Sequence, residues 1–132
     1  MKFRDYQIEI IDKSHTVLEA HRFVYLSMEV RTGKTLTAMG VATKLGIKNL
    51  LFVTKKKAIS SISADYKKLN PKYDLTVINY ESLHKVEGEF ELMVLDEAHT
   101  LGAYPKPSKR TKLIKQMISK QKPYVILMSG TP

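Results

Sequence analysis

The sequence predicts an α/β domain, a mainly parallel β-sheet with helices on both faces. Short runs rich in apolar and β-branched residues alternate along the chain with longer amphipathic segments. These runs are apolar on both faces, which is typical of strands buried between two helix layers. The length of 132 residues, with 43% apolar and 27% charged residues, fits one compact core and excludes wholesale disorder.

The expected elements follow from the apolar periodicity and the turn residues that bound it. In chain order we expect a helix around Asp5–Asp12, strand Arg22–Met28, helix Lys34–Leu45, strand Asn49–Thr54, helix Lys57–Leu69, strands Leu75–Asn79 and Glu91–Leu95, helix Arg110–Ser119 and strand Tyr124–Ser129. Gly46 and Asn70-Pro71 are helix stop signals. No repeat or low-complexity linker divides the chain, so residues 1–132 are expected to form one domain. Ligands of such open sheets bind at the carboxyl ends of the strands.

Composition excludes several classes of protein. The absence of cysteine rules out disulfides and thiolate metal sites, and only four histidines give a zinc site little support. The first residues carry no signal peptide, and the longest apolar runs are too short to span a bilayer. We therefore expect a soluble, intracellular protein without a membrane partner.

The charge distribution indicates a polyanionic partner. The net charge is +9, and after Glu97 there is no acidic residue while seven lysines and arginines follow. Such a field attracts nucleic acid, although a solvated lysine-rich surface explains the charge equally well.

A phosphate site is predicted where the first strand meets its helix. The segment from Glu29 through Val30, Arg31 and Thr32 leads to Gly33-Lys34-Thr35. Phosphate loops use backbone N–H groups at a helix start, a lysine for the outer phosphates and a hydroxyl for Mg²⁺. The match is partial, because Met28 stands where the full pattern has glycine.

A second candidate site is the adjacent acidic pair Asp96 and Glu97, which follows a buried strand. Burying charge is costly unless it is used. Beside a phosphate loop, one carboxylate can hold the Mg²⁺ shell and the next can orient and deprotonate the attacking water. An exposed turn is the structural alternative for this pair, and for Ser129-Gly130-Thr131-Pro132 at the last strand's end.

Six segments together resemble superfamily-two helicases and translocases, most closely the Swi/Snf-like and related phage branch. They cover nearly the whole chain in the family's motif order: Phe3-Arg4-Asp5-Tyr6-Gln7 (the adenine motif), Glu29–Thr35 (motif I), Leu51–Lys55 (motif Ia), Val77–Leu83 (the branch's strand end), Asp96-Glu97-Ala98-His99 (motif II, DEAH form) and Ser129–Pro132 (motif III).

The resemblance implies a RecA-like ATP-binding domain whose motif III strand lies between the strands of motifs I and II. It implies that Gln7 reads adenine, that residues Glu29 to Thr35 hold ATP, that Thr35 and Asp96 hold Mg²⁺, and that Lys34, Asp96 and Glu97 carry catalysis. Nucleic-acid contact and coupling would fall to Thr54, Lys55, Asn79, Tyr80, His99, Ser129 and Thr131. The implied partner is DNA rather than RNA, and we expect a monomer in a bacterial or phage-infected cytoplasm, or in the nucleus of a eukaryote.

Two departures from the family pattern shape the expected activity. Arg31 stands where motif I usually has glycine, and it either narrows the loop, adds charge toward the phosphates or faces solvent. The second RecA-like domain of the family, with its catalytic arginines, has no counterpart here, and the sequence stops directly after motif III, as an excised piece would. We therefore expect an ATP-binding half that holds nucleotide and hydrolyses it slowly.

A non-catalytic nucleic-acid-binding module that keeps the fold is the alternative. Arg31 and the basic carboxyl third suit it, whereas an acidic pair after a buried strand does not. A small phosphate-loop kinase fits less well, because it has no use for motif II, motif III or the Gln7 segment. Mg²⁺-dependent nucleotide binding that Lys34→Ala removes separates the enzyme from the module.

Overall fold

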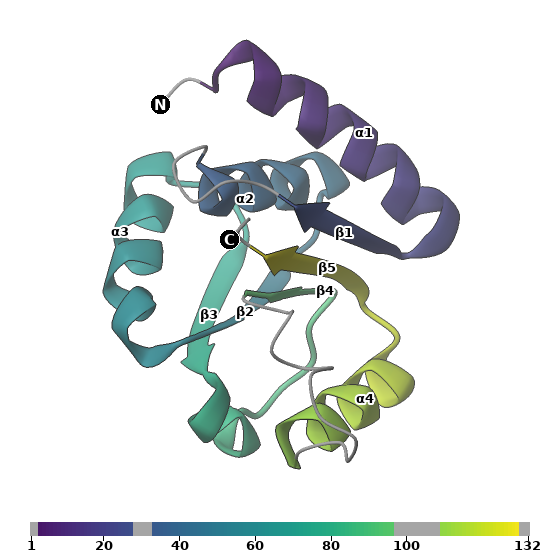
Figure 1. Cartoon of the computed structure of the whole chain (residues 1–132), viewed down its shortest axis with the longest axis vertical. Coiled ribbons are helices and arrows are strands. Elements are labelled where there is room, and N and C mark those ends of the chain that lie inside the picture. Colours follow the sequence, from purple (N-terminus) through teal and green to yellow (C-terminus); the bar gives the residue numbers. More distant parts are fainter. Residues whose placement is uncertain (1–2, 28–32, 97–108, 130–132) are drawn as a thin grey trace.

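The computed structural model describes residues 3–27, 33–96 and 109–129, and these form a five-stranded, all-parallel sheet covered by helices (Figure 1). The helices are α1 (Asp5–His21), α2 (Lys34–Leu45), α3 (Ile59–Leu69) and α4 (Lys109–Gln121). The strands are β1 (Phe23–Ser27), β2 (Asn49–Thr54), β3 (Asp74–Asn79), β4 (Leu92–Leu95) and β5 (Tyr124–Ser129). Two short 3₁₀ helices, η2 (Lys56–Ala58) and η3 (Tyr80–Lys85), follow β2 and β3.

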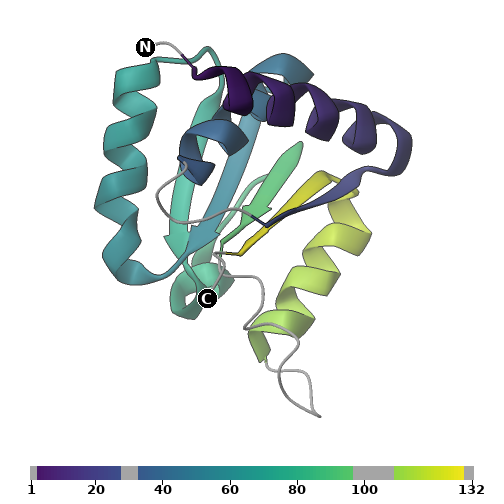
Figure 2. The same cartoon turned by 45° about the horizontal axis from the view of Figure 1, so that its top comes forward.

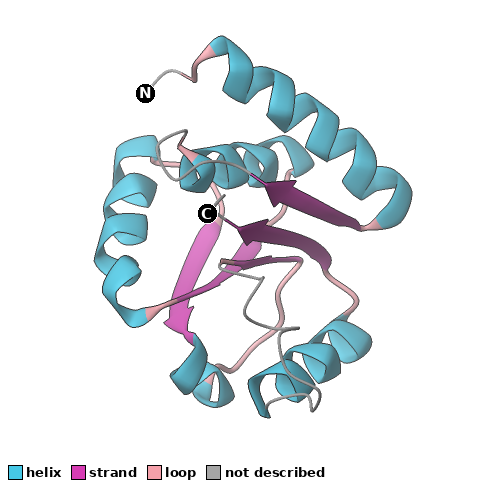
Figure 3. Ribbon diagram, viewed as in Figure 1, coloured by secondary structure: helices cyan, strands magenta, loops and turns pink. Residues whose placement is uncertain are grey.

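The strand order is β1-β5-β4-β2-β3, and every pairing is parallel. This confirms the α/β class with a parallel sheet. It also confirms the implied position of the last strand, because β5 lies between β1 and β4. All five strands therefore end at one edge of the sheet, where the candidate residues follow β1, β2 and β4 (Figure 3).

Alternating side chains of the strands build a core on each face of the sheet. Leu50, Phe52 and Val94 pack with residues of α1, α2 and α3 on one face. Leu51 and Val53 point the other way and pack with residues of η3 and α4. Figure 2 shows α1 and α4 on opposite sides of the strands. The central strands β2 and β4 are buried on both faces, as their apolar sequences predict.

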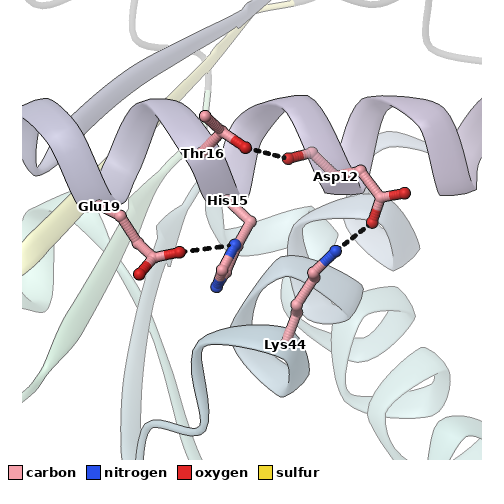
Figure 4. A network of polar contacts seen from close by, with 5 residues as sticks. All are labelled: Asp12, His15, Thr16, Glu19 and Lys44. Carbon is pink, nitrogen blue, oxygen red and sulfur yellow. Dashed lines mark hydrogen bonds and ion pairs between the residues drawn. The ribbon is translucent and has the colours of Figure 1, made fainter.

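The first helix is longer than the sequence predicts, extending to His21 instead of ending near Asp12. The extension continues the buried face of the helix, because Ser14 is buried between Ile11 and Leu18 on one continuous face. Figure 4 shows the polar contacts along this stretch. His15 Nδ1 lies 2.9 Å from Glu19 Oε1, Thr16 donates to the Asp12 carbonyl at 3.1 Å, and Lys44 of α2 binds the Asp12 carboxylate.

The remaining boundaries differ by a few residues, except for η3, which the sequence analysis did not predict. The chain enters α3 through the 3₁₀ turn η2, and α4 extends the expected helix by a residue before and two after it. Both predicted stops are confirmed: Gly46 and Asn70 adopt left-handed conformations and their N–H groups bond the last helical turn. In the described part of the chain, no helix is long and apolar enough to cross a membrane.

Candidate functional site

The candidate site lies at the carboxyl edge of the sheet, where three central segments converge. Lys34 is the first residue of α2, Asp96 follows β4, and Thr54 is the last residue of β2. All three are at most 8% exposed. Parallel pairing of β2 with β4 brings the last two side by side, and the start of α2 brings the lysine to them.

Asp96 is the centre of this arrangement. Its Oδ1 atom lies 3.2 Å from Lys34 Nζ, and its Oδ2 atom accepts a hydrogen bond from the Thr54 hydroxyl at 2.8 Å. The main-chain carbonyl of Asp96 accepts a hydrogen bond from the Tyr80 hydroxyl. A buried carboxylate that is both ion-paired and hydrogen-bonded avoids most of the cost of burying its charge.

Gly33 connects the loop to α2 and also contacts the amino-terminal helix. Its backbone is left-handed, with φ at 71°, a conformation that disfavours any residue with a side chain. An added Cβ would also lie 2.5 Å from Gln7 Nε2, which is too close. Gln7 is buried; its amide nitrogen donates to the Gly33 carbonyl at 3.4 Å and its amide oxygen accepts from the Arg4 N–H at 2.9 Å. The structure thus brings Gln7, predicted from a distant segment, directly against the loop's final residue.

A cavity of about 280 Å³ opens beside this centre. The described residues that line it are Gly33, Lys34, Thr35, Leu36, Lys55, Ala58, Ser61, Ile62, Asp65 and Asp96. This lining includes two lysines and two aspartates, and the amino terminus of α2 adds the positive end of a helix dipole, which favours anions. The Thr35 hydroxyl and the Asp96 carboxylate are oxygen ligands of the kind that Mg²⁺ prefers.

Ser61 and Asp65 of α3 are cavity residues that the sequence analysis missed. They are four residues apart on one helix face, with Ile62 between them in the core. That spacing was visible in the sequence. Which face of α3 meets the start of α2 was not, because it depends on how the two helices pack.

Burial raises the pKa of the Asp65 carboxyl, and the nearby Lys68 opposes this shift only in part. Because the pKa of Asp65 in the folded protein lies above the ordinary 3.8, folding favours the protonated carboxyl. The stability that the protonated carboxyl contributes at low pH is therefore lost as the pH rises through the raised pKa. We therefore expect Asp65→Asn to be slightly more stable than the unsubstituted protein at pH 7. The difference should vanish below pH 3.8, as measured by urea unfolding across pH. A constant difference at every pH would contradict this origin.

The residues expected at the strand-end loops divide into two groups. Lys55 is exposed and lines the cavity, and Asn79 is half-buried and donates to Glu81 at 2.9 Å. Thr54 and Tyr80 are 0% and 6% exposed, and their hydroxyl groups bind Asp96. As placed, these two side chains belong to the centre of the site and not to its surface.

Other predicted site residues lie outside the described part of the chain. They are Glu29, Val30, Arg31, Thr32, Glu97, His99 and Thr131. Ser129 is described only as the backbone end of β5, paired in register with Ser27 of β1.

Comparison with known proteins identifies the family. Residues 1–85 match the family model described as "Type III restriction enzyme, res subunit" (ResIII). The chain belongs to this family. ResIII domains are of the superfamily-two helicase and translocase type, an ATP-binding family, which agrees with the resemblance of the motifs. A comparison with curated protein sequences found no significant match.

Solved structures share the fold of this ResIII domain. The SWI2/SNF2 ATPase core of Sulfolobus solfataricus, in complex with double-stranded DNA, aligns over 100% of the chain with a TM-score of 0.80 and 20% identity. The Type ISP restriction-modification enzymes LlaBIII, bound to DNA, and LlaGI, with a DNA substrate mimic, each align over 99% of the chain, with TM-scores of 0.60 and 0.65 and identities of 17% and 16%. The ResIII domain spans 32%, 13% and 17% of these three chains.

Proposed function

We propose that this ResIII domain is the ATP-binding half of a DNA helicase or translocase. The observation that carries the proposal is the buried contact of 3.2 Å between Lys34 Nζ and Asp96 Oδ1, at an anion-attracting cavity beside the start of α2. Lys34 begins α2 and Asp96 follows β4. A lysine and a carboxylate placed in this way can together bind a phosphate that carries a metal ion.

Each residue of the centre has a part in this function. The N–H groups at the start of α2 receive the phosphates, and Lys34 exchanges the Asp96 carboxylate for a phosphate oxygen as ATP enters. Mg²⁺ would be held by the Thr35 hydroxyl and Asp96, and it would neutralise charge on the phosphates. Glu97 is proposed as the base for the attacking water, and Gln7, which already contacts the loop, as the adenine-reading residue.

Charge and the similar folds support DNA as the partner. The S. solfataricus core was solved with double-stranded DNA, and both Type ISP enzymes were solved with DNA or a mimic of it. This domain has a net charge of +9, and the exposed Lys55 stands at the cavity on the sheet edge. We assign nucleic-acid contact to Lys55 and Asn79, and domain coupling to His99, Ser129 and Thr131.

We expect these 132 residues alone to bind ATP and hydrolyse it slowly. No arginine is among the described residues that line the cavity. In related phosphoryl-transfer systems an added arginine accelerates hydrolysis on the order of a thousandfold or more. A second domain is therefore proposed as the partner that completes the site.

Glu97→Gln separates binding from chemistry. Because glutamine cannot take a proton from water, hydrolysis should fall on the order of 100-fold or more while nucleotide affinity changes little. The measurement is a titration with a fluorescent ATP analogue in Mg²⁺, beside steady-state phosphate release with duplex DNA present. Equal loss of affinity and of hydrolysis would contradict the role of Glu97 as a base.

The second candidate function, a non-catalytic nucleic-acid-binding module, is favoured by the same net charge of +9. Duplex binding that weakens steeply with salt is expected under both functions. The module predicts no Mg²⁺-dependent nucleotide binding in the unsubstituted protein, whereas the ATP-binding half predicts saturable binding.

A further inference from the structure

We infer that Thr54 and Tyr80 are positioning residues that hold Asp96 in the orientation needed for Mg²⁺–nucleotide binding. The inference rests on the proposed function, and it gives these residues a different task from the nucleic-acid contact that their positions after strands suggest. The complete burial of Thr54 and near-complete burial of Tyr80 keep both side chains away from a polymer on the surface.

Asp96 is fixed at each of its polar groups. Its backbone N–H donates to the Val53 carbonyl at 2.8 Å, which extends the β2–β4 ladder by one step. Its backbone carbonyl receives the Tyr80 hydroxyl, and its two carboxylate oxygens meet Thr54 and Lys34. The backbone and the side chain of this residue are thus held by different neighbours.

The Thr54 hydrogen bond fixes one of the two carboxylate oxygens of Asp96. Thr54 donates to Oδ2 from the end of β2, whereas Lys34 contacts the other oxygen, Oδ1. A hydrogen bond to an ionised, buried acceptor is among the stronger ones in proteins. Without it the carboxylate could rotate about its last bond, whose preferences are broad.

Tyr80 fixes the backbone that carries this carboxylate. Its ring packs in the core formed by η3, β2 and α4, and this packing fixes the position of the hydroxyl group. Tyr80 directly follows Asn79 of β3, and Thr54 directly precedes Lys55. One hydrogen bond therefore links each of these strand ends to Asp96.

The test is a Mg²⁺ titration of nucleotide binding, using a fluorescent ATP analogue at fixed concentration. Thr54→Val keeps the shape of the side chain and removes the donor, and Tyr80→Phe does the same for the ring. We expect each to raise the Mg²⁺ concentration at half-saturation, on the order of tenfold for Thr54→Val. Thr54→Ser restores the donor and should return this concentration to within about twofold of the original. Thr43→Val is the matched control, because the Thr43 hydroxyl donates to the Met39 carbonyl within α2.

The outcomes separate the inference from the proposed function. If the unsubstituted protein binds the analogue and Thr54→Val leaves the Mg²⁺ midpoint unchanged, the inference is overturned and the proposed function stands. If Thr54→Val and Thr43→Val raise the midpoint equally, or Thr54→Ser fails to restore it, the effect is general and the inference is also overturned. If the unsubstituted protein binds no nucleotide, the proposed function is overturned. A double-mutant cycle of Thr54→Val with Asp96→Ala in urea unfolding then decides whether Thr54 holds Asp96, because alanine leaves no side-chain acceptor for the Thr54 hydroxyl.

Discussion

Lys34→Ala is expected to reduce affinity for Mg²⁺–ATP on the order of 10- to 100-fold, because it removes the charged donor at the start of α2 that meets the phosphates. The measurement is a titration with the fluorescent analogue in Mg²⁺, with the folded fraction determined in parallel. That second determination matters here, because the substitution also leaves the buried Asp96 carboxylate without this cation.

Lys44→Ala is the matched control for this prediction. Lys44 lies at the other end of α2 and pairs with Asp12, and its side chain is 41% exposed, against 10% for Lys34. The control should bind the analogue as the unsubstituted protein does. If both variants lose affinity equally, or neither does, Lys34 is not a phosphate ligand.

Asp96→Ala is expected to lower the free energy of unfolding by about 3–5 kcal/mol, the usual cost of breaking a buried ion pair by removing one partner. The substitution removes the carboxylate that Lys34 contacts in a nearly buried position. The Thr54 hydroxyl loses its carboxylate acceptor, and the Tyr80 hydroxyl bonds a backbone carbonyl that the side chain of residue 96 no longer helps to hold. Asp96→Asn retains a side-chain oxygen as an acceptor for Thr54 and should lose less. Urea unfolding with linear extrapolation measures both.

Asp12→Ala provides the comparison for this second prediction. Asp12 also pairs with a lysine of α2, but at a surface where both side chains are about half exposed. Exposed ion pairs contribute about 0–1 kcal/mol, so this variant should unfold close to the unsubstituted protein. If Asp96→Ala lowers the free energy of unfolding no more than Asp12→Ala does, the Lys34–Asp96 contact does not stabilise the protein as a buried ion pair.

The fold could be predicted from the sequence because its strands are short, apolar on both faces and bounded by strong stops. Gly46 and Asn70 end their helices as expected, and β5 lies between β1 and β4 as the family resemblance implies. The length of α1 could not be predicted, because Ser14 is polar and its burial depends on packing against other elements. The 3₁₀ helix η3 was missed for a similar reason. Tyr80 and Leu83 are buried in the core beside α4, and the local sequence does not indicate that burial.

The site could be predicted only in part. Lys34 and Asp96 were identified from local motifs, and parallel strand ends explain why they meet. Where the Thr54 and Tyr80 side chains lie was harder to foresee, because a residue that ends or follows a strand can point either into a surface loop or into the centre of the site. Only the tertiary structure shows that their hydroxyl groups bind Asp96. Asp65 carries no motif, and it reaches the cavity through the packing of α3 on α2.

We expect Mg²⁺–nucleotide to bind at the start of α2, beside Asp96. Backbone amide chemical shifts of the isotope-labelled protein test it most directly, recorded while Mg²⁺–ADP is added. We predict saturable shifts that are largest at Gly33, Lys34, Thr35 and Asp96, and that disappear when Mg²⁺ is replaced by a chelator. Shifts centred elsewhere, or none at millimolar nucleotide, would contradict the claim.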